Sequence, residues 1–499
     1  MTAGLLNRFE KLAYFCVYIA YIVIGLYKIY ALRDRILSTT DFQFADGWSL
    51  LKRSDVALKR DDSNDELENF ADFIAKFWPY YLLHALVSGV TRWKWSYLRR
   101  PGHVAICALA LGINLHWTSI AMFGSLLVSY YLIALHARSK LYTWLLTAAW
   151  IGALNIAKNS QWWLSQVGYA EYVMLIVTLS WSLLRGCSYS FTATGSKNLS
   201  EYLAYTMYFP CLTYGPFISY ERFKQQPMGE AVSPNWSFLV ALLRVVFWWL
   251  VLQWSLHYFY INYMTRDVRA VVMMESVFWQ HAAGYFMGQF FFIFYVITYG
   301  LGIAFAEYDD IAAPRRPRCI GRIHFYSDMW KYFDEGLYEF LFKHIYAELC
   351  SRKSSPAAKL CATALTFSFV FIWHGCYTYV LIWSILNFVC LAAEKLYKTF
   401  VSRPAYQNWS LKHFGTAGAQ RLHAILATQL FIPAAFSNVY FIAGQEVGGF
   451  LMRGAYLSGI GPPRTRKLKK LRLLIDHIQK LYETALNVNY SIVNALNIN

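Results

Sequence analysis

The sequence predicts an all-α membrane protein that crosses the bilayer many times. Of its 499 residues, 57% are hydrophobic and only 15% are charged, whereas a soluble globular chain carries about 25% charged residues. Tyr and Trp are abundant, with 38 and 19 residues, as expected where many membrane helices meet water. A hydrocarbon core about 30 Å thick selects apolar runs of about 20 residues, and the chain contains about ten or eleven such runs.

The apolar runs are the expected spans, and they extend from the N-terminal region to about residue 445. The first run, at 12–32, has charge on both sides and no small-residue cleavage site, so we interpret it as a retained span rather than a signal peptide. The polar loop 33–69 is expected to be a solvated connector without chemistry of its own. The other runs lie at 73–91, 103–136 (two spans), 140–158, 171–190, 236–262, 278–306, 360–376, 377–398 and 421–445.

One apolar segment cannot form a regular helix. Residues 203–219 contain Pro210, Gly215 and Pro216, and a proline inside a helix removes a hydrogen bond and clashes with the preceding turn. Irregular backbone at membrane depth is stable only where protein or a cavity satisfies its polar groups. We therefore expect a broken or re-entrant segment.

Residues 307–350 are too charged to span the bilayer, although they are rich in aromatic residues. From Trp330 onward the apolar positions follow helical spacing and form one stripe, made of Phe333, Leu337, Phe340, Leu341 and Ile345. Such a stripe is typical of a helix that lies against the membrane or re-enters it.

The chain is expected to form one membrane domain and a tail. Residues 1–460 hold all the spans, with the chemically informative motifs between 200 and 400, and residues 461–499 are basic. The tail places Leu and Ile on one helical face and Lys and Arg on the other. This pattern predicts an amphipathic helix on an anionic lipid surface rather than a span.

Charge, cysteines and motifs exclude several functions. The net charge of +17 is distributed between the apolar runs, which indicates charge flanking membrane helices and not nucleic-acid binding. The nine cysteines lack CxxC pairs and metal-ligand spacing, so we predict neither a disulfide framework nor a metal site. No P-loop, GxGxxG, HExxH or GxSxG motif is found in the sequence, which argues against nucleotide hydrolysis and metalloproteolysis.

His374 is the first candidate for chemistry because it ends the apolar run LTFSFVFIWHG. Ionisable residues inside a membrane segment are costly and are usually functional. Its imidazole is suited to take a proton from an attacking amine or hydroxyl. From residue type alone, a structural histidine at the membrane interface fits equally well.

Asp334 is the second candidate, in WKYFDEGLYEF. A carboxylate here can orient a histidine, hold a cationic amine or share a proton load, although alone it reads more readily as a surface carboxylate. Cys319 follows Arg315, Arg316 and Arg318, which favour a thiolate, but an ordinary interfacial thiol is the stronger interpretation from residue type.

These motifs resemble the membrane-bound O-acyltransferase family. The resemblance is carried by WKYFDEGLYEFLFKHIY, by the apolar run ending in WHG, and by EYLAYTMYFPCLTYGPFISYERF, in this order over residues 200–376. Within that family, lipid and sugar acyltransferases commonly have Asn at the position of Asp334, whereas the Hedgehog acyltransferase branch has Asp. RPRCIGRIHFYSDMWKYFDEGL, YGPFISYERFKQQ and FIAGQEVG are also similar to that branch.

The resemblance implies transfer of palmitate from palmitoyl-CoA to the N-terminal cysteine of a secreted signal. Hedgehog precursors are the implied acceptors, with EGF-like ligands as a second group, in the membrane of the endoplasmic reticulum or the Golgi. It makes His374 the general base and Asp334 an essential supporting residue, with Trp330 and Trp373 lining the site. It also implies haem-b bound through Cys319, as a structural group.

Two departures from that branch bear on this reading. Gln445 stands where the relatives carry Asn in a substrate-pocket motif, so we expect its contact with substrate to be longer or displaced. The basic tail from Arg464 stands where the relatives have one further apolar span.

Other functions remain open from sequence. An enzyme of the same family that acylates a lysophospholipid or a sterol fits the same motifs. A transporter with an intramembrane histidine relay is an alternative of another class, although the chain shows no inverted internal repeat. A non-catalytic relative that binds signals or lipid is expected to lack His374, which this chain retains.

Overall fold

The computed structural model describes residues 8–457 except for 54–55, 94, 137–138, 159–160, 193–197, 226–234, 324 and 352. Most of the described chain is helical, which confirms the all-α prediction. The N-terminal helices are α1 Arg8–Thr39, α2 Asp65–Trp93, α3 Arg99–Asn114, α4 Trp117–His136, α5 Lys140–Ala157, α6 Gln161–Val167, α7 Tyr169–Thr192, α8 Leu199–Thr206, α9 Tyr220–Lys224 and α10 Asn235–Ser255, with the 3₁₀ helices η1 Ser96–Leu98 and η2 Phe209–Cys211.

The remaining helices follow the loop after α10. They are α11 Ile261–Arg266, α12 Val268–Val272, α13 Val277–Tyr308, α14 Tyr326–Phe333, α15 Glu335–Leu341, α16 Ala347–Leu349, α17 Pro356–His374, α18 Thr378–Val401 and α19 Pro404–Leu457, with the 3₁₀ helix η3 Ile320–Arg322 and the π-helix η4 Phe342–Tyr346. Non-helical backbone at Gly415 and Gly444 divides α19 into consecutive helical pieces.

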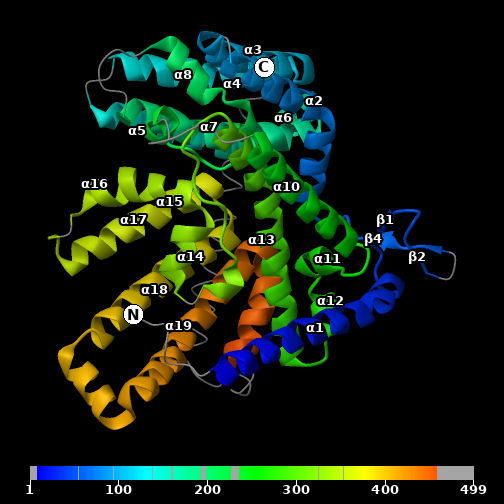
Figure 1. The fold of residues 1–499 in the computed structure, drawn as a ribbon, viewed down its shortest axis with the longest axis vertical. Coiled ribbons are helices and arrows are strands. Elements are labelled where there is room, and N and C mark those ends of the chain that lie inside the picture. Colours follow the sequence, from blue (N-terminus) through cyan, green and yellow to red (C-terminus); the bar gives the residue numbers. More distant parts are fainter. Residues whose placement is uncertain are drawn as a thin grey trace, which may run out of the picture.

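Helix α13 runs through the middle of the molecule and joins two groups of helices (Figure 1). Helices α2 to α8 gather at one end, and α14, α18 and α19 at the other (Figure 1). Helix α13 packs against α10 and α19, and α18 packs against α19. A single long helix therefore contacts both groups, and the candidate site described below is built around it.

Seven described helices are long and apolar enough to cross a membrane by length and composition: α1, α4, α10, α13, α17, α18 and α19. The runs predicted at 73–91, 140–158 and 171–190 form α2, α5 and α7, and 103–136 forms two helices as expected. Of these five helices, α2, α3, α4, α5 and α7, only α4 belongs to the seven. The predicted span at 236–262 ends earlier, because α10 stops at Ser255.

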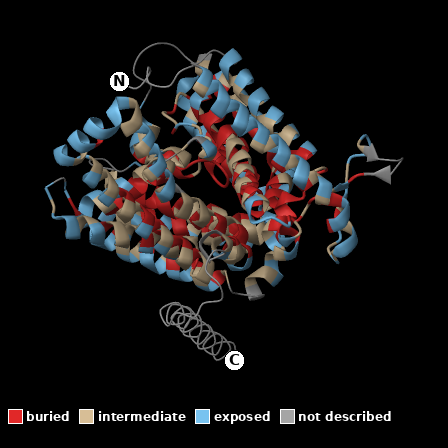
Figure 2. Cartoon of the chain, turned by 90° about the horizontal axis from the view of Figure 1, so that it is seen from below, coloured by how far each residue is buried: buried red, intermediate tan, exposed pale blue. Residues whose placement is uncertain are grey.

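The outer surface of the bundle is apolar. Buried residues gather between the helices, while the outward faces are exposed (Figure 2). On α10, Leu239, Leu243 and Phe247 are 44%, 56% and 58% exposed. Exposed apolar surface of this extent is compatible with lipid and not with water, so the chain is a multi-pass membrane protein.

The loop predicted to be a solvated connector is instead anchored to the protein. Short antiparallel pairs join β1 Ala45–Asp46 to β4 Lys59–Arg60 and β2 Lys52–Arg53 to β3 Val56–Ala57. Asp61 is fully buried and accepts a 3.0 Å hydrogen bond from the backbone N–H of Tyr263. The polar composition predicted solvation wrongly because buried backbone donors satisfy this carboxylate.

The prediction holds for residues 203–219 and fails for the segment after Trp330. Residues 203–219 form the end of α8, then η2 and non-helical backbone, as the prolines predict. The continuous helix predicted from Trp330 to Ile345 is wrong, because the backbone leaves helical geometry at Asp334 (φ −128°, ψ 83°) and separates α14 from α15. The tail predicted at 461–499 lies outside the described residues.

Candidate active site

His374 is the last residue of α17, and the sequence around it explains why the helix ends there. The helix begins at Pro356, after Ser355 caps it by accepting the N–H of Ala358, and proline is favoured at the first helical position. Gly375 has φ +122°, and a Cβ added there would lie 2.7 Å from the ring of Tyr377. Only glycine fits this conformation and this space, so the chain turns sharply after the histidine.

Side chains from the α5 region hold the end of α17 in place. Lys158 donates to the backbone carbonyl of His374 at 3.1 Å. Asn155 donates to the carbonyl of Ile372 at 3.0 Å and accepts from the N–H of Cys376 at 3.2 Å. The last carbonyls of a helix have no partner within the helix, and a cation there is favourable. The position of His374 is therefore set by its backbone.

The imidazole of His374 lies among aromatic rings. The ring centroids of Trp373, Trp383 and Phe441 lie 4.7, 5.4 and 5.2 Å from its own. Within the described part of the chain, no hydrogen bond to either ring nitrogen is present. Its nitrogens are thus available to a reacting group rather than engaged in a structural network.

Asp334 occupies the break between α14 and α15, and both carboxylate oxygens have partners. Oδ1 accepts the backbone N–H of Leu337 at 2.9 Å and caps α15. Oδ2 accepts the hydroxyl of Tyr299, on α13, at 2.7 Å. In the structure these two contacts join Asp334 to α15 and α13 and not to His374, so a role in orienting the histidine stays a prediction.

Gly336 brings this break against the irregular segment 203–219. A Cβ at Gly336 would overlap the carbonyl oxygen of Phe217 and lie 3.0 Å from its carbonyl carbon. On the other side of the segment, a Cβ at Gly302 of α13 would lie 2.9 Å from Pro216. Two close approaches that only glycine permits thus clamp the segment between α13 and α15.

His374 and Asp334 line the same cavity, of about 110 Å³. The structure also brings Trp330 and Trp373 to this cavity, where the resemblance placed them. Trp330 donates to the side-chain oxygen of Asn387 at 2.7 Å, and Trp373 donates to the carbonyl of Ser180 at 3.1 Å. The other lining residues are Trp181, Phe291, Tyr295, Tyr299, Ile320, Met329, Phe333, Leu337, Trp383, Asn438, Phe441 and Ile442.

Two larger cavities adjoin the one that holds His374. One, of about 870 Å³, shares Trp330 with it and has Lys395, Lys398 and Arg403 in its lining. Another, of about 550 Å³, shares four residues with it, namely Ile320, Met329, Asn438 and Ile442. Ligand pockets typically measure about 300–1,000 Å³, so the small reactive cavity lies between two volumes of substrate or cofactor size.

Two predicted site residues lie outside the central cavity. The side chain of Gln445 is exposed, directly after the non-helical Gly444, and does not line the central cavity. Cys319 is half-buried, and its sulfur lies 3.7 Å from the side-chain oxygen of Gln289. Gln289 and Gly321 both line the 550 Å³ cavity, so Cys319 stands beside that space.

Sequence reasoning missed several residues of the site. Tyr299 and Asn387 lie inside apolar runs that were interpreted only as spans, and Asn155 and Lys158 lie at the end of another. A polar residue in the middle of an apolar run is a usable signal, and Asn387 carries it. Tyr299 does not stand out among the many tyrosines of the chain.

Comparison with known proteins identifies the class. Residues 126–437 match the membrane-bound O-acyltransferase family, MBOAT. The chain belongs to this family, which confirms the resemblance seen in its motifs.

Individual relatives narrow the class further. The chain is 64% identical to the protein-cysteine N-palmitoyltransferase Rasp of Drosophila melanogaster over 92% of each chain. It is 26% identical to the protein-cysteine N-palmitoyltransferase HHAT of Mus musculus over 64% of this chain and 68% of the mouse protein. It is 23% identical to the membrane-bound O-acyltransferase GUP2 of Saccharomyces cerevisiae over 53% of this chain and 42% of the yeast protein.

Proposed function

We propose that this chain is a protein-cysteine N-palmitoyltransferase, which moves palmitate from palmitoyl-CoA to the N-terminal cysteine of secreted signalling proteins. The observation that carries the proposal is the shared cavity of His374 and Asp334, between two larger cavities, in a chain 64% identical to a relative named for this activity. The acceptors we propose are Hedgehog precursors, with EGF-like ligands as a second group.

The reaction moves one proton from the attacking amine to the leaving sulfur, and we assign this transfer to His374. The α-amine of the acceptor attacks the thioester carbon of palmitoyl-CoA, so a C–N bond forms and the C–S bond breaks. His374 accepts the proton that the amine loses and returns it to the sulfur of the leaving CoA. The products are an N-terminal amide and CoA thiol, and the aromatic walls of the cavity keep water from competing with the amine.

Asp334 acts as a positioning residue in this proposal. Its contacts with Leu337 and Tyr299 tie the start of α15 to α13. Both helices contribute walls to the cavity, through Leu337 on one side and Phe291, Tyr295 and Tyr299 on the other. Loss of the carboxylate is expected to misplace these walls, and a displacement of about 1 Å can lower a rate about 100-fold.

The 870 Å³ cavity is suited to the acyl donor. Lys398 is paired with Glu394 at 2.5 Å, whereas the described residues offer Lys395 and Arg403 no acidic partner. These two cations are appropriate for the phosphates of CoA. Trp330 separates this cavity from the one with His374, so a thioester at the boundary reaches the histidine while the phosphates remain at the basic side.

Haem-b is the cofactor implied by the resemblance, and the surroundings of Cys319 fit it. The thiol is half-buried beside a cavity of about 550 Å³ with an apolar and aromatic lining that includes Tyr21, Phe325 and Phe436. Cys319 would hold the haem iron as a thiolate, and Tyr285 and Gln289 line the cavity beside it. When bound there, haem would supply a structural anchor for the loop between α13 and α14.

We place the protein in the membrane of the endoplasmic reticulum, with the Golgi as the alternative. Secreted signals pass through these compartments, whereas acyl-CoA is made in the cytosol. In our proposal the cavity with His374 is where donor and acceptor meet, because it adjoins both larger cavities. Membrane lipid surrounds the apolar exterior of the protein.

A reconstituted transfer assay tests the proposal. The purified full chain is mixed with palmitoyl-CoA and a peptide that begins with Cys, and mass spectrometry locates the added acyl group. We expect amide-linked palmitate with wild type and with His413→Ala, an exposed histidine on α19, and none with His374→Ala. Transfer at the wild-type rate by His374→Ala would overturn the assignment of the base.

The alternatives are distinguished in the same preparation. Acylation of a lysophospholipid or a sterol, with no acylation of the peptide, would identify a lipid O-acyltransferase. Solute flux across liposomes without acyl transfer would identify a transporter. A matched peptide whose N-terminal amine is acetylated should receive no amide-linked palmitate.

A further inference from the structure

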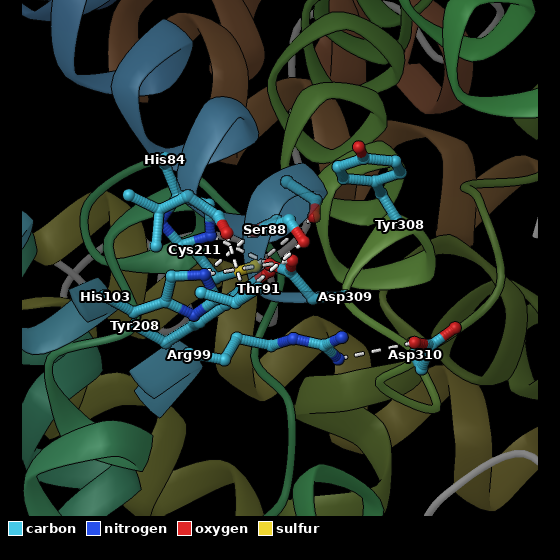
Figure 3. A network of polar contacts seen from close by, with 12 residues as sticks. His84, Ser88, Thr91, Arg99, His103, Tyr208, Cys211, Tyr308, Asp309 and Asp310 are labelled. Carbon is cyan, nitrogen blue, oxygen red and sulfur yellow. Dashed lines mark hydrogen bonds and ion pairs between the residues drawn. The ribbon is translucent and has the colours of Figure 1, made fainter. Parts of the chain in front are cut away.

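A buried polar cluster lies apart from the proposed reaction. His84 of α2, His103 of α3 and Asp309, directly after α13, come together from three places in the chain (Figure 3). Their exposed fractions are 0%, 5% and 7%. None of them lines the three cavities described above. Buried ionisable groups are costly unless they are paired or hold a metal, so the cluster requires a physical explanation.

The three side chains aim their polar atoms at one another. Nε2 of His84 lies 2.8 Å from Oδ2 of Asp309, and Nε2 of His103 lies 4.0 Å from Oδ1. The two imidazole rings stack at 3.8 Å between centroids. One ligand atom from each residue lies within 4.8 Å of the others. Oδ1 of Asp309 and Nδ1 of His84 are buried without a hydrogen-bond partner of normal geometry within the described chain.

The arginines near the cluster are engaged by a different carboxylate. Arg92 and Arg99 lie 3.4 and 3.5 Å from Asp310, and Arg92 also donates to the carbonyl of Tyr308. They therefore neutralise the neighbouring residue rather than Asp309. A buried carboxylate that faces two imidazoles, with one oxygen unpaired, matches the donor set of a metal site.

We propose that His84, His103 and Asp309 bind a divalent transition metal of the zinc class. Zinc takes histidine nitrogen and carboxylate oxygen at about 2.0–2.2 Å in tetrahedral geometry, which separates two ligand atoms by about 3.3–3.5 Å. In the structure Nε2 of His84 faces Oδ2 of Asp309 at 2.8 Å, and Nε2 of His103 faces Oδ1 at 4.0 Å. Metal binding would therefore rotate the two stacked imidazoles and the carboxylate until both nitrogens and one oxygen converge on the ion, with a water in the fourth position.

The surrounding residues form a supporting shell for such a site. Tyr208 donates to Oδ2 of Asp309 at 2.6 Å, and the hydroxyl of Ser88 lies 2.8 Å from Nε2 of His103. Partners of this kind orient metal ligands and tune their basicity. When the metal is bound to Nε2 of His103, the Ser88 hydroxyl is released to bond Oδ1 of Asp309 or the metal-bound water.

The metal would fasten the irregular segment to the helix that supports the reactive cavity. Tyr208 belongs to the segment 203–219, which continues to Pro216, packed on α13, and to Phe217, packed on α15. Asp309 follows the end of the same α13 that carries Tyr299. A metal here would join α2, α3 and the end of α13, so the role we propose for it is to hold these elements together, independently of the proposed acyl transfer.

Metal content tests this proposal directly. The full chain is purified in detergent without chelator and analysed by inductively coupled plasma mass spectrometry for zinc. We expect about one zinc per chain in wild type and in His116→Ala, a half-buried histidine bonded to Thr118. His84→Ala and His103→Gln should lose it, and His103→Gln retains a polar group toward Ser88 so that the fold is preserved. Zinc content in both variants equal to that of wild type would overturn the proposal.

Two further readouts do not depend on the fold of a variant or on catalysis. Removal of zinc from wild type by a chelator should lower its melting temperature, and added zinc should restore it. X-ray absorption at the zinc edge should show nitrogen and oxygen ligands, because the proposed set lacks sulfur. A sulfur ligand would refute the site. The site would also be refuted if wild-type protein contained no zinc and its melting temperature changed neither with chelator nor with added zinc.

Discussion

Substitution of Gly336 by alanine is the most direct test of how the reactive cavity is held together. A Cβ at this position would overlap the carbonyl oxygen of Phe217 and lie 3.0 Å from its carbonyl carbon, where ordinary contact begins at 3.4 Å. Both residues are buried, so the overlap cannot be relieved by a flexible side chain. The start of α15 must move away by an amount on the order of 1 Å, at a cost of about 1–3 kcal/mol.

Asp334 lies two residues before Gly336 and moves with it. A misplacement of about 1 Å can lower a rate about 100-fold, equivalent to about 2.7 kcal/mol. We therefore expect kcat for palmitoyl transfer to fall about 100-fold. KM for palmitoyl-CoA should change as well, because Tyr338 and Leu341 of α15 line the donor cavity. The assay is steady-state transfer to a peptide with an N-terminal cysteine.

Gly124→Ala is the matched control, because a Cβ at Gly124 of α4 meets no atom within 4 Å. Helical alanine is favoured over glycine by about 1 kcal/mol, so this variant should retain its rate and have a melting temperature equal to or above that of wild type. If Gly336→Ala keeps kcat within about twofold of wild type, equivalent to about 0.4 kcal/mol, then contact with Phe217 does not position Asp334, and the reasoning fails.

Three further predictions follow from individual contacts. Asp334→Asn should keep the melting temperature of wild type, because Asn caps helices as well as Asp, whereas Asp334→Ala should lose about 1 kcal/mol of stability. Both variants should lower kcat. Wild-type kcat in Asp334→Asn would show that the charge is dispensable. Tyr299→Phe removes the 2.7 Å hydrogen bond to Asp334, which we expect to cost about 1–3 kcal/mol. Tyr299→Phe should therefore lower kcat, whereas Tyr14→Phe, on the exposed surface, should not. Equal values of kcat for the two variants would contradict this prediction. Burial raises the pKa of Asp61 to about 6, so the folded state holds its proton more tightly than the unfolded state. Stability should therefore fall as the pH rises from about 4 to about 6, and the melting temperature of Asp61→Asn should change less over that range than that of wild type.

Composition and hydrophobic runs predicted the membrane class and most helix positions, because both depend on the length of apolar sequence that a bilayer selects. The same reasoning predicted the irregular segment 203–219 from Pro210 and Pro216, whose effect on a helix is local. It failed from Trp330 to Ile345, because the break at Asp334 depends on contacts with Tyr299 and Phe217, which are distant in sequence.

The candidate site was predicted only in part for the same reason. His374 is visible as an ionisable residue at the end of an apolar run, whereas its connection to Asp334 came from a family resemblance and not from spacing. His84, His103 and Asp309 lie too far apart in the chain to form a recognisable ligand motif. Their proximity becomes visible only when α2, α3 and α13 are packed together.

The helix cap at Asp334 has a consequence for how such enzymes diverge. The position must hold a residue that accepts the N–H of Leu337, and Asn and Asp meet this need almost equally. A single nucleotide change in the codon can therefore exchange one for the other while the cap on α15 is kept, and it adds or removes a carboxylate at the reactive cavity. Selection can alter the chemistry of this position in one mutational step, which makes it a natural point at which lineages with different acceptors separate.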